Sequence, residues 1–165
     1  MSEALARQKS GARDMAGLVA RLILGAGFIY LGWHKALHPV EFLKLVRQYD
    51  MVHNYVLLDF IAAVLPWFEV FCGLLLLVGV AVRGTALVCI LMLAPFTWLV
   101  FRRALELKAA GGIPFCAVKF DCGCGTGEEY ICGKLLQNGV LLLLAAWLAM
   151  GQGRKLCLRY GLMRK

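Results

Sequence analysis

The sequence predicts an all-α membrane protein, a four-helix transmembrane bundle with a short interfacial helix between the first and second spans. The chain of 165 residues is 61% hydrophobic and has a mean hydropathy of +0.74, whereas a soluble domain is about half apolar. Its apolar residues form long runs, each close to the ~20 residues that cross a hydrocarbon core of ~30 Å. The runs lack the alternation that is typical of strands, so helices are the expected spanning structure.

Four runs are long enough to cross a membrane, and we expect spans at about residues 15–33, 57–80, 84–101 and 134–152. A polar, basic stretch precedes the first run, as in a signal peptide. That run is too long for a signal sequence and lacks a clear small-x-small cleavage site, so we expect it to be retained as a helix. The chain then forms one transmembrane domain, residues 15–152, between an N-terminal tail, 1–14, and a basic C-terminal tail, 153–165.

The three connections between the spans differ in character. Residues 81–83 leave room only for a tight antiparallel hairpin between the second and third spans. In the first connection, Pro39 stands where a helix would start, and apolar residues follow at helical spacing, which predicts a short amphipathic helix at the interface: Val40, Leu43, Val46 and Tyr49. The third connection, residues 102–133, carries four of the seven cysteines.

The net charge of +8 is carried mostly by basic residues that flank the spans. At those positions they bind anionic lipid and set the orientation of the chain. No basic stripe with interleaved aromatic residues is present in the sequence, which argues against nucleic acid as a partner. Nine Lys and Arg residues fall on the side of the two termini and eight on the other side. We therefore expect a bacterial inner-membrane protein with both termini in the cytoplasm and its cysteine connection in the periplasm, where disulfides persist.

The cysteines of this connection, which we call the cysteine loop, are the strongest indication of chemistry. Cys116, Cys122, Cys124 and Cys132 lie within 17 residues of one another. A disulfide between Cys122 and Cys124 would close a very small ring, which Gly123 permits. Strain makes such a bridge easy to reduce. This pattern predicts a thiol–disulfide relay, in which all four cysteines are candidate catalytic residues.

The pairing of these four cysteines stays open at this point, because four cysteines allow three connectivities. Cys116 and Cys132 would form a second pair that resolves the first, or each would bridge to one member of the Cys-Gly-Cys motif. Static disulfides that brace an exposed loop are an alternative. So is Cu(I) handling by the motif, since soft thiolates suit that ion. The spacing does not match the usual zinc or iron–sulfur patterns, so no metal site is assigned.

The remaining cysteines have a simpler interpretation. Cys72 and Cys89 lie in the second and third spans, and Cys157 lies in the C-terminal tail. Buried cysteine packs as a small hydrophobic residue, and a cytoplasmic thiol stays reduced. We expect no chemistry from these three.

Two ionisable residues, Arg21 and Glu69, fall inside apolar spans, where such groups are rare and face inward. The two spans run in opposite directions, and the depths of these residues differ by only a turn or two. We expect an ion pair between Arg21 and Glu69 that orders the bundle. The functional alternative is a proton carrier beside a quinone, with Glu69, Trp67 and Arg21 as the candidate site and Pro66 kinking the helix.

The sequence resembles the MauE/DoxX family of redox-associated membrane proteins, and the MauE branch most closely, over about residues 21–147. The resemblance is carried by a set of short motifs in this order: Gly32-Trp33-His34-Lys35, His38-Pro39-Val40-Glu41-Phe42, Tyr49, Leu65-Pro66-Trp67-Phe68-Glu69, Gly73-Leu74-Leu75-Leu76, Asp121-Cys122-Gly123-Cys124 and Asn138. Neither Pro-Trp-x-Glu nor Cys-Gly-Cys is specific alone, but together they are fairly specific.

The resemblance implies a four-helix membrane bundle that works beside a periplasmic thioredoxin-like protein or a disulfide-containing client. Quinone is the candidate acceptor by analogy with other membrane disulfide-generating systems.

The sequence departs from the family pattern at three places. Gly125-Thr126-Gly127 replaces the usual Phe-Gly, Gln137 replaces an Arg, and Cys116 and Cys132 look like additions. The lost Arg removes a charge that would steady the loop or a partner, and the added cysteines suggest a longer relay or a more heavily braced loop.

Overall fold

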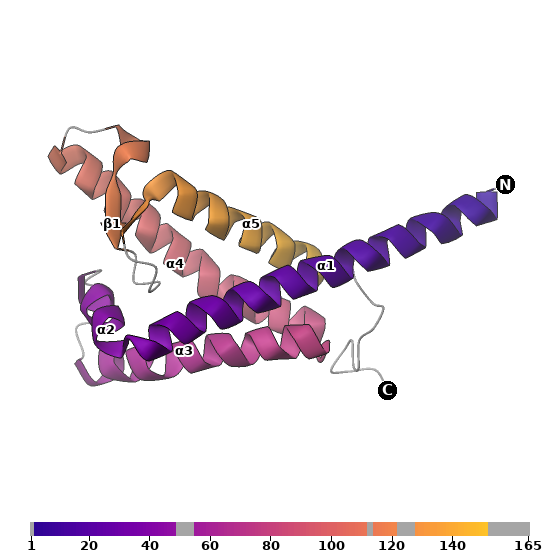
Figure 1. The fold of residues 1–165 in the computed structure, drawn as a ribbon, viewed down its shortest axis with the longest axis horizontal. Coiled ribbons are helices and arrows are strands. Elements are labelled where there is room, and N and C mark those ends of the chain that lie inside the picture. Colours follow the sequence, from indigo (N-terminus) through magenta and orange to yellow (C-terminus); the bar gives the residue numbers. More distant parts are fainter. Residues whose placement is uncertain (1, 49–54, 112–113, 122–127, 152–165) are drawn as a thin grey trace.

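The computed structural model of the chain describes residues 2–48, 55–111, 114–121 and 128–151. Figure 1 shows its helices as two long antiparallel pairs with a small ribbon at one end. In chain order the elements are α1 (Ser2–Leu37), α2 (Pro39–Gln48), α3 (Tyr55–Val78), α4 (Val82–Gly111), the 3-10 helix η1 (Phe115–Ala117), β1 (Lys119–Asp121), β2 (Glu128–Tyr130) and α5 (Ile131–Ala149).

Four of these helices are long and apolar enough to cross a membrane, and they confirm the predicted fold class. The apolar segments are Asp14–Leu37, Val56–Val78, Val82–Ala109 and Ile131–Ala149. The short helix α2 lies between the first two of them, as expected. The helices extend past the predicted spans. The helix α1 already begins at Ser2, and α4 continues to Gly111.

The helices α1 and α3 approach each other closely because glycines remove the side chains at their crossing points. A Cβ added at Gly73 would lie 2.6 Å from the carbonyl oxygen of Gly25, and one added at Gly32 would lie 2.6 Å from that of Pro66. These contacts match residue 25 with 73 and residue 32 with 66, so the two helices are antiparallel. The helix α3 continues through Pro66, with no break in its assignment.

The turn between α3 and α4 lies slightly earlier than the sequence predicts, at residues 79–81 rather than 81–83. Gly79 has a φ of 80°, in the left-handed region where glycine carries no Cβ penalty. Its N–H and that of Val80 both donate to the carbonyl of Leu75, at 2.9 and 3.0 Å. This is the usual glycine ending of a helix, and it explains why α3 stops at Val78.

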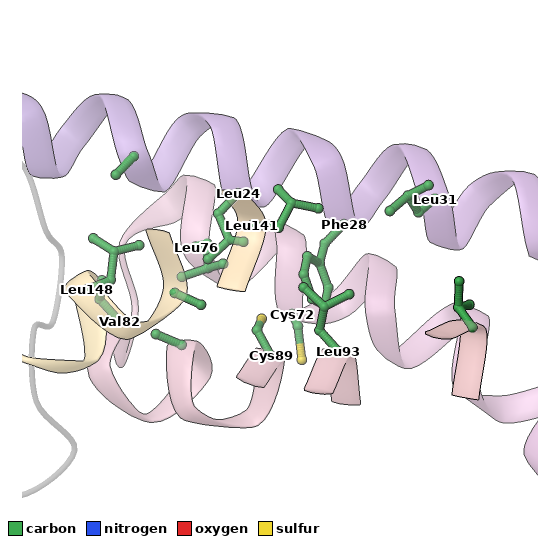
Figure 2. Close-up of a cluster of buried hydrophobic side chains, with 14 of the residues drawn as sticks. Leu24, Phe28, Leu31, Cys72, Leu76, Val82, Cys89, Leu93, Leu141 and Leu148 are labelled. Carbon is green, nitrogen blue, oxygen red and sulfur yellow. The ribbon is translucent and has the colours of Figure 1, made fainter. Parts of the chain in front are cut away.

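The core is a column of apolar side chains that all four long helices supply. Leu24, Phe28, Leu76, Leu93 and Leu141 belong to it, and Figure 2 shows them interleaved between the helices. Many large apolar side chains point outward instead, among them Phe60, Phe71, Leu91, Trp98, Leu136 and Leu143. In a soluble protein such a surface would be a liability, whereas here it is the surface that contacts lipid tails.

We call the end of the bundle that carries α2 and the β ribbon the loop end, and the end with the 79–81 turn the turn end. At the loop end β1 and β2 pair antiparallel, with Lys119 opposite Tyr130 and Asp121 opposite Glu128. The sequence pattern does not predict this ribbon. Three residues per strand are too few for a readable alternation.

Candidate functional site

A disulfide between Cys116 and Cys132 closes the cysteine loop. Their Cα atoms lie 5.1 Å apart, and the bridge ties η1 to the first turn of α5. Cys116 is exposed and Cys132 is half-buried. The structure therefore brings together two of the four predicted cysteines. The arrangement in which each of them bridges to the Cys-Gly-Cys motif is not formed.

The other two predicted cysteines, Cys122 and Cys124, lie outside the described residues. Their segment, 122–127, connects the paired ends of β1 and β2. The predicted pairing of Cys122 with Cys124 therefore stays a prediction.

A buried ion pair between Lys35 and Glu69 is the main polar feature of the membrane-spanning region. The Lys35 Nζ donates to both carboxylate oxygens of Glu69, at 2.6 and 2.9 Å. The two side chains are only 4% and 11% exposed. The ammonium group also lies 5.5 Å from the ring centre of Phe42 and 5.1 Å from that of Phe96, in cation–π contact. Both charges are thus compensated away from water.

Lys35 reaches this position by pointing into the bundle. From the α1–α3 register, its backbone lies level with about residue 63 of α3, six residues short of Glu69. At 1.5 Å per residue the two backbone positions are offset by roughly 9 Å along the bundle, and the two side chains together bridge this offset. A lysine near a helix end normally extends outward to the interface instead. Lys35 is therefore a buried charge, although its position near the end of the first span predicts a surface charge.

The expected pairing of Arg21 with Glu69 is corrected by this geometry. Arg21 is 2% exposed, and its Nη2 donates to the carbonyl of Leu77 at 3.5 Å. Leu77 lies eight residues beyond Glu69, about 12 Å along α3. The prediction erred because it judged depth from the predicted span ends, whereas the glycine contacts set the true register.

A pocket opens beside the ion pair, and all four long helices line it. Its walls are Phe28, Leu31, Lys35, Glu69, Met92, Leu93, Phe96 and Asn138. The space open to the centres of water molecules is about 20 Å³, which is room for one or two waters. The Asn138 Nδ2 is buried without a hydrogen-bond partner among the described residues, and the residue is 1% exposed. A buried amide of this kind normally has a hydrogen-bond acceptor, which a water or a ligand in the pocket would supply.

Of the three residues proposed for a quinone or proton site, only Glu69 lines this pocket. Trp67 is 57% exposed and packs edge-on against Trp33 on the outer surface, with ring centres 6.2 Å apart. Arg21 is not among the lining residues. Lys35 and Asn138 take their places. A buried carboxylate calls for a cation within reach, but the sequence does not tell which lysine points inward.

Two further residues that sequence reasoning set aside, Cys72 and Cys89, meet in the core between α3 and α4. Both belong to the buried core cluster, and Figure 2 shows the two side chains next to one another. The spacing of these two cysteines in the sequence could have predicted their contact. Cys72 is seven residues before Gly79 and Cys89 is seven residues after Val82. Equal distances from a tight turn put two residues at the same depth of a helical hairpin.

No group of three or more His, Cys, Asp or Glu side chains with metal-binding spacing occurs among the described residues.

Comparison with known proteins identifies the family. The family described as methylamine utilisation protein MauE matches residues 13–151, which is most of the chain. The chain therefore belongs to the MauE family, as the sequence motifs indicated. Among curated proteins and among solved structures, nothing matches it.

Proposed function

We propose that this member of the MauE family is a membrane thiol–disulfide relay, which exchanges disulfides with a periplasmic thioredoxin-like or client protein through Cys122 and Cys124. The observation that carries the proposal is the Cys116–Cys132 disulfide. It fixes the base of the cysteine loop and leaves Cys122 and Cys124 as the remaining cysteines of that loop. A loop anchored on α5 would present them to a partner at the membrane surface.

The proposed exchange begins with a Cys122–Cys124 disulfide and a reduced partner. A partner thiolate attacks one sulfur of the bridge, which forms a mixed disulfide and releases the other sulfur as a thiolate. The second partner thiol then displaces the motif, so the partner leaves oxidised and the motif holds two thiols. Two electrons have moved from the partner to the loop. Cys116 and Cys132 would take these electrons onward by the same exchange.

Quinone is the proposed terminal acceptor, and the pocket beside Lys35 and Glu69 is the proposed place for it. Lys35 and Asn138 would donate to quinone oxygens, and Glu69 would carry a proton. With room for one or two waters at present, the pocket would widen by movement of Met92 and Phe96. Methionine changes rotamer easily enough for that.

The proposed location is a bacterial inner membrane with the loop end facing the periplasm. The apolar outer surfaces of the four long helices would anchor the protein in the bilayer. This placement also gives the Cys116–Cys132 bridge an oxidising compartment.

The test is to oxidise the purified full-length protein in detergent and add reduced thioredoxin as the dithiol probe. We expect the protein to oxidise thioredoxin, scored by alkylation of the remaining thiols. The C122S and C124S variants should fail, whereas C157S, outside the loop, should match the unaltered protein. Thioredoxin oxidised at the normal rate and extent by both C122S and C124S would contradict the relay.

A second candidate function is a non-catalytic anchor or assembly subunit with structural disulfides. The observation that favours it is again the Cys116–Cys132 bridge, since it braces η1 against α5. In that case the unaltered protein, C122S and C124S would all give the same result in the thioredoxin assay. The C116S variant would have a lower stability and no change in that assay. Copper handling, the third candidate, predicts Cu(I) in the purified protein and its loss in C122S.

A further inference from the structure

The buried cysteine pair of α3 and α4 has a setting that simple packing does not require. Cys72 is 3% exposed and Cys89 is fully buried. Glu69 lies three residues before Cys72 on α3, and Met92 three residues after Cys89 on α4. Residues three apart share a helix face, with Cβ atoms about 5–6 Å apart. Since Glu69 and Met92 both line the polar pocket, each thiol is one helical turn from the pocket wall.

The geometry of the hairpin favours a bond between these two sulfurs. The 79–81 turn sets both residues at one depth, roughly 10 Å from the turn end. Both side chains belong to the buried core cluster, and Figure 2 shows them next to one another; Glu69 lies one helical turn before Cys72 on α3.

We propose that Cys72 and Cys89 form a reversible disulfide inside the bundle, oxidised by a lipid-soluble quinone. Two S–H bonds break and one S–S bond forms, while two electrons and two protons pass to the quinone, which leaves as the quinol. The oxidant must be lipid-soluble because the pair is closed to water. Glu69 stands between the pair and the pocket, where it would accept a thiol proton.

This pair is separate from the cysteine loop. Phe115, next to Cys116, packs against Phe101, which lies twelve residues and about 18 Å along α4 from Cys89, so the Cys116–Cys132 bridge is too far away for direct exchange. The inference therefore goes beyond the proposed relay and does not depend on it. A bundle with an inert loop would still oxidise Cys72 and Cys89.

The sequence offers a direct mapping experiment. Trypsin cleavage after Arg47, Arg83 and Arg102 releases peptides 48–83 and 84–102, each with one cysteine. The full-length protein would be reduced, treated with a short-chain ubiquinone analogue, alkylated and digested. We expect the two peptides to be joined in most chains, and dithiothreitol to separate them. The variant C116S/C122S/C124S/C132S should give the same link, which distinguishes this couple from the loop.

Matched controls make either result decisive. Cys72→Ser should abolish the link and leave Cys89 free to alkylate, while peptides 109–119 and 120–134 stay joined through the Cys116–Cys132 bridge. That loop bridge also reports that the chain is folded. If Cys72 and Cys89 stay fully alkylatable after quinone and also after diamide, in protein whose loop bridge re-forms, the pair is packing and the proposal is wrong. Linkage by diamide but not by quinone would overturn the assigned oxidant.

Discussion

Lys35 and Glu69 are opposite charges inside an apolar bundle, and neither is tolerable there alone. Moving one ion from water to a protein interior costs several kcal/mol, and only a well-placed partner offsets that cost. Both carboxylate oxygens bond the ammonium group, and two aromatic rings flank it. Removing one of the two charged side chains should therefore destabilise the protein more than removing both.

We predict that Glu69→Leu destabilises the protein by about 3–5 kcal/mol, because it leaves the Lys35 ammonium buried without its counter-ion. Lys35→Met combined with Glu69→Leu should recover most of that loss. Unfolding of detergent-solubilised protein, followed by circular dichroism, measures both. Asp59→Asn is the matched control, since its pair with Arg47 is exposed at both ends and should contribute ~1 kcal/mol or less. If the double variant is as unstable as Glu69→Leu, the loss does not come from an unpaired Lys35 charge and the prediction is wrong.

The sequence predicted which buried carboxylate matters, but not which side chain pairs with it. Glu69 stood out because a carboxylate in mid-span is rare, and it does line the pocket. Its partner was missed because pairing depends on the register between α1 and α3. An error of a few residues in the predicted end of a helix moves that register by a full helical turn. Lys35 and Asn138 were missed as site residues because side-chain direction, rather than position in the chain, brings them to the pocket.

Among the elements, α1 and α3 depend on glycine for their contact. Gly73→Ala would place a Cβ 2.6 Å from the Gly25 oxygen and 2.7 Å from the Ile29 Cγ1. Since the closer atom is backbone, the helices must separate. We predict a loss of about 1–3 kcal/mol, measured by the same unfolding assay. Gly139→Ala is the control, because a Cβ added at that position on α5 would have nothing within 4 Å, and equal losses in both variants would rule out close packing as the cause.

The bridge between η1 and α5 should stabilise the loop end chiefly through the unfolded state. Cys116 and Cys132 are 16 residues apart, and closing a loop of about this size is worth ~3 kcal/mol in the chain-entropy account. The variant C116S/C132S should lose roughly that amount. In a Cys72→Ser background, which cannot form the Cys72–Cys89 bridge, dithiothreitol should lower the stability of the loop-bridged protein to the same level and leave the C116S/C132S variant unchanged. A variant as stable as the oxidised protein would show that the bridge is not a brace.

The elements show clearly which features a sequence reveals. Long apolar runs predicted all four spans, and regular spacing after Pro39 predicted α2. The turn moved from 81–83 to 79–81 because Gly79 adopts a left-handed conformation, which hydropathy does not register. The β1–β2 ribbon was missed since its strands are too short to show a period.

The orientation of the whole molecule follows from which basic residues actually reach the membrane surface. The raw count, nine on the side of the termini against eight on the loop end, decides little. Lys35 and Lys134, both counted at the loop end, are 4% and 2% exposed and lie inside the bundle. Without them the loop end keeps six basic residues, Lys44, Arg47, Arg102, Arg103, Lys108 and Lys119. The proposed orientation, with the termini in the cytoplasm, agrees with this lower number at the loop end, because the side richer in Lys and Arg stays inside.

Labelling in intact cells checks this orientation. In a variant whose own cysteines are replaced by serine, Lys119→Cys adds an exposed thiol at the loop end and Arg83→Cys adds one at the turn end. We predict that a membrane-impermeant maleimide, applied to cells with a permeabilised outer membrane, labels Lys119→Cys and spares Arg83→Cys until the inner membrane is lysed. Labelling of Arg83→Cys alone would invert the topology. The cysteine loop would then face the reducing cytoplasm, and the proposed exchange with a periplasmic partner would be excluded.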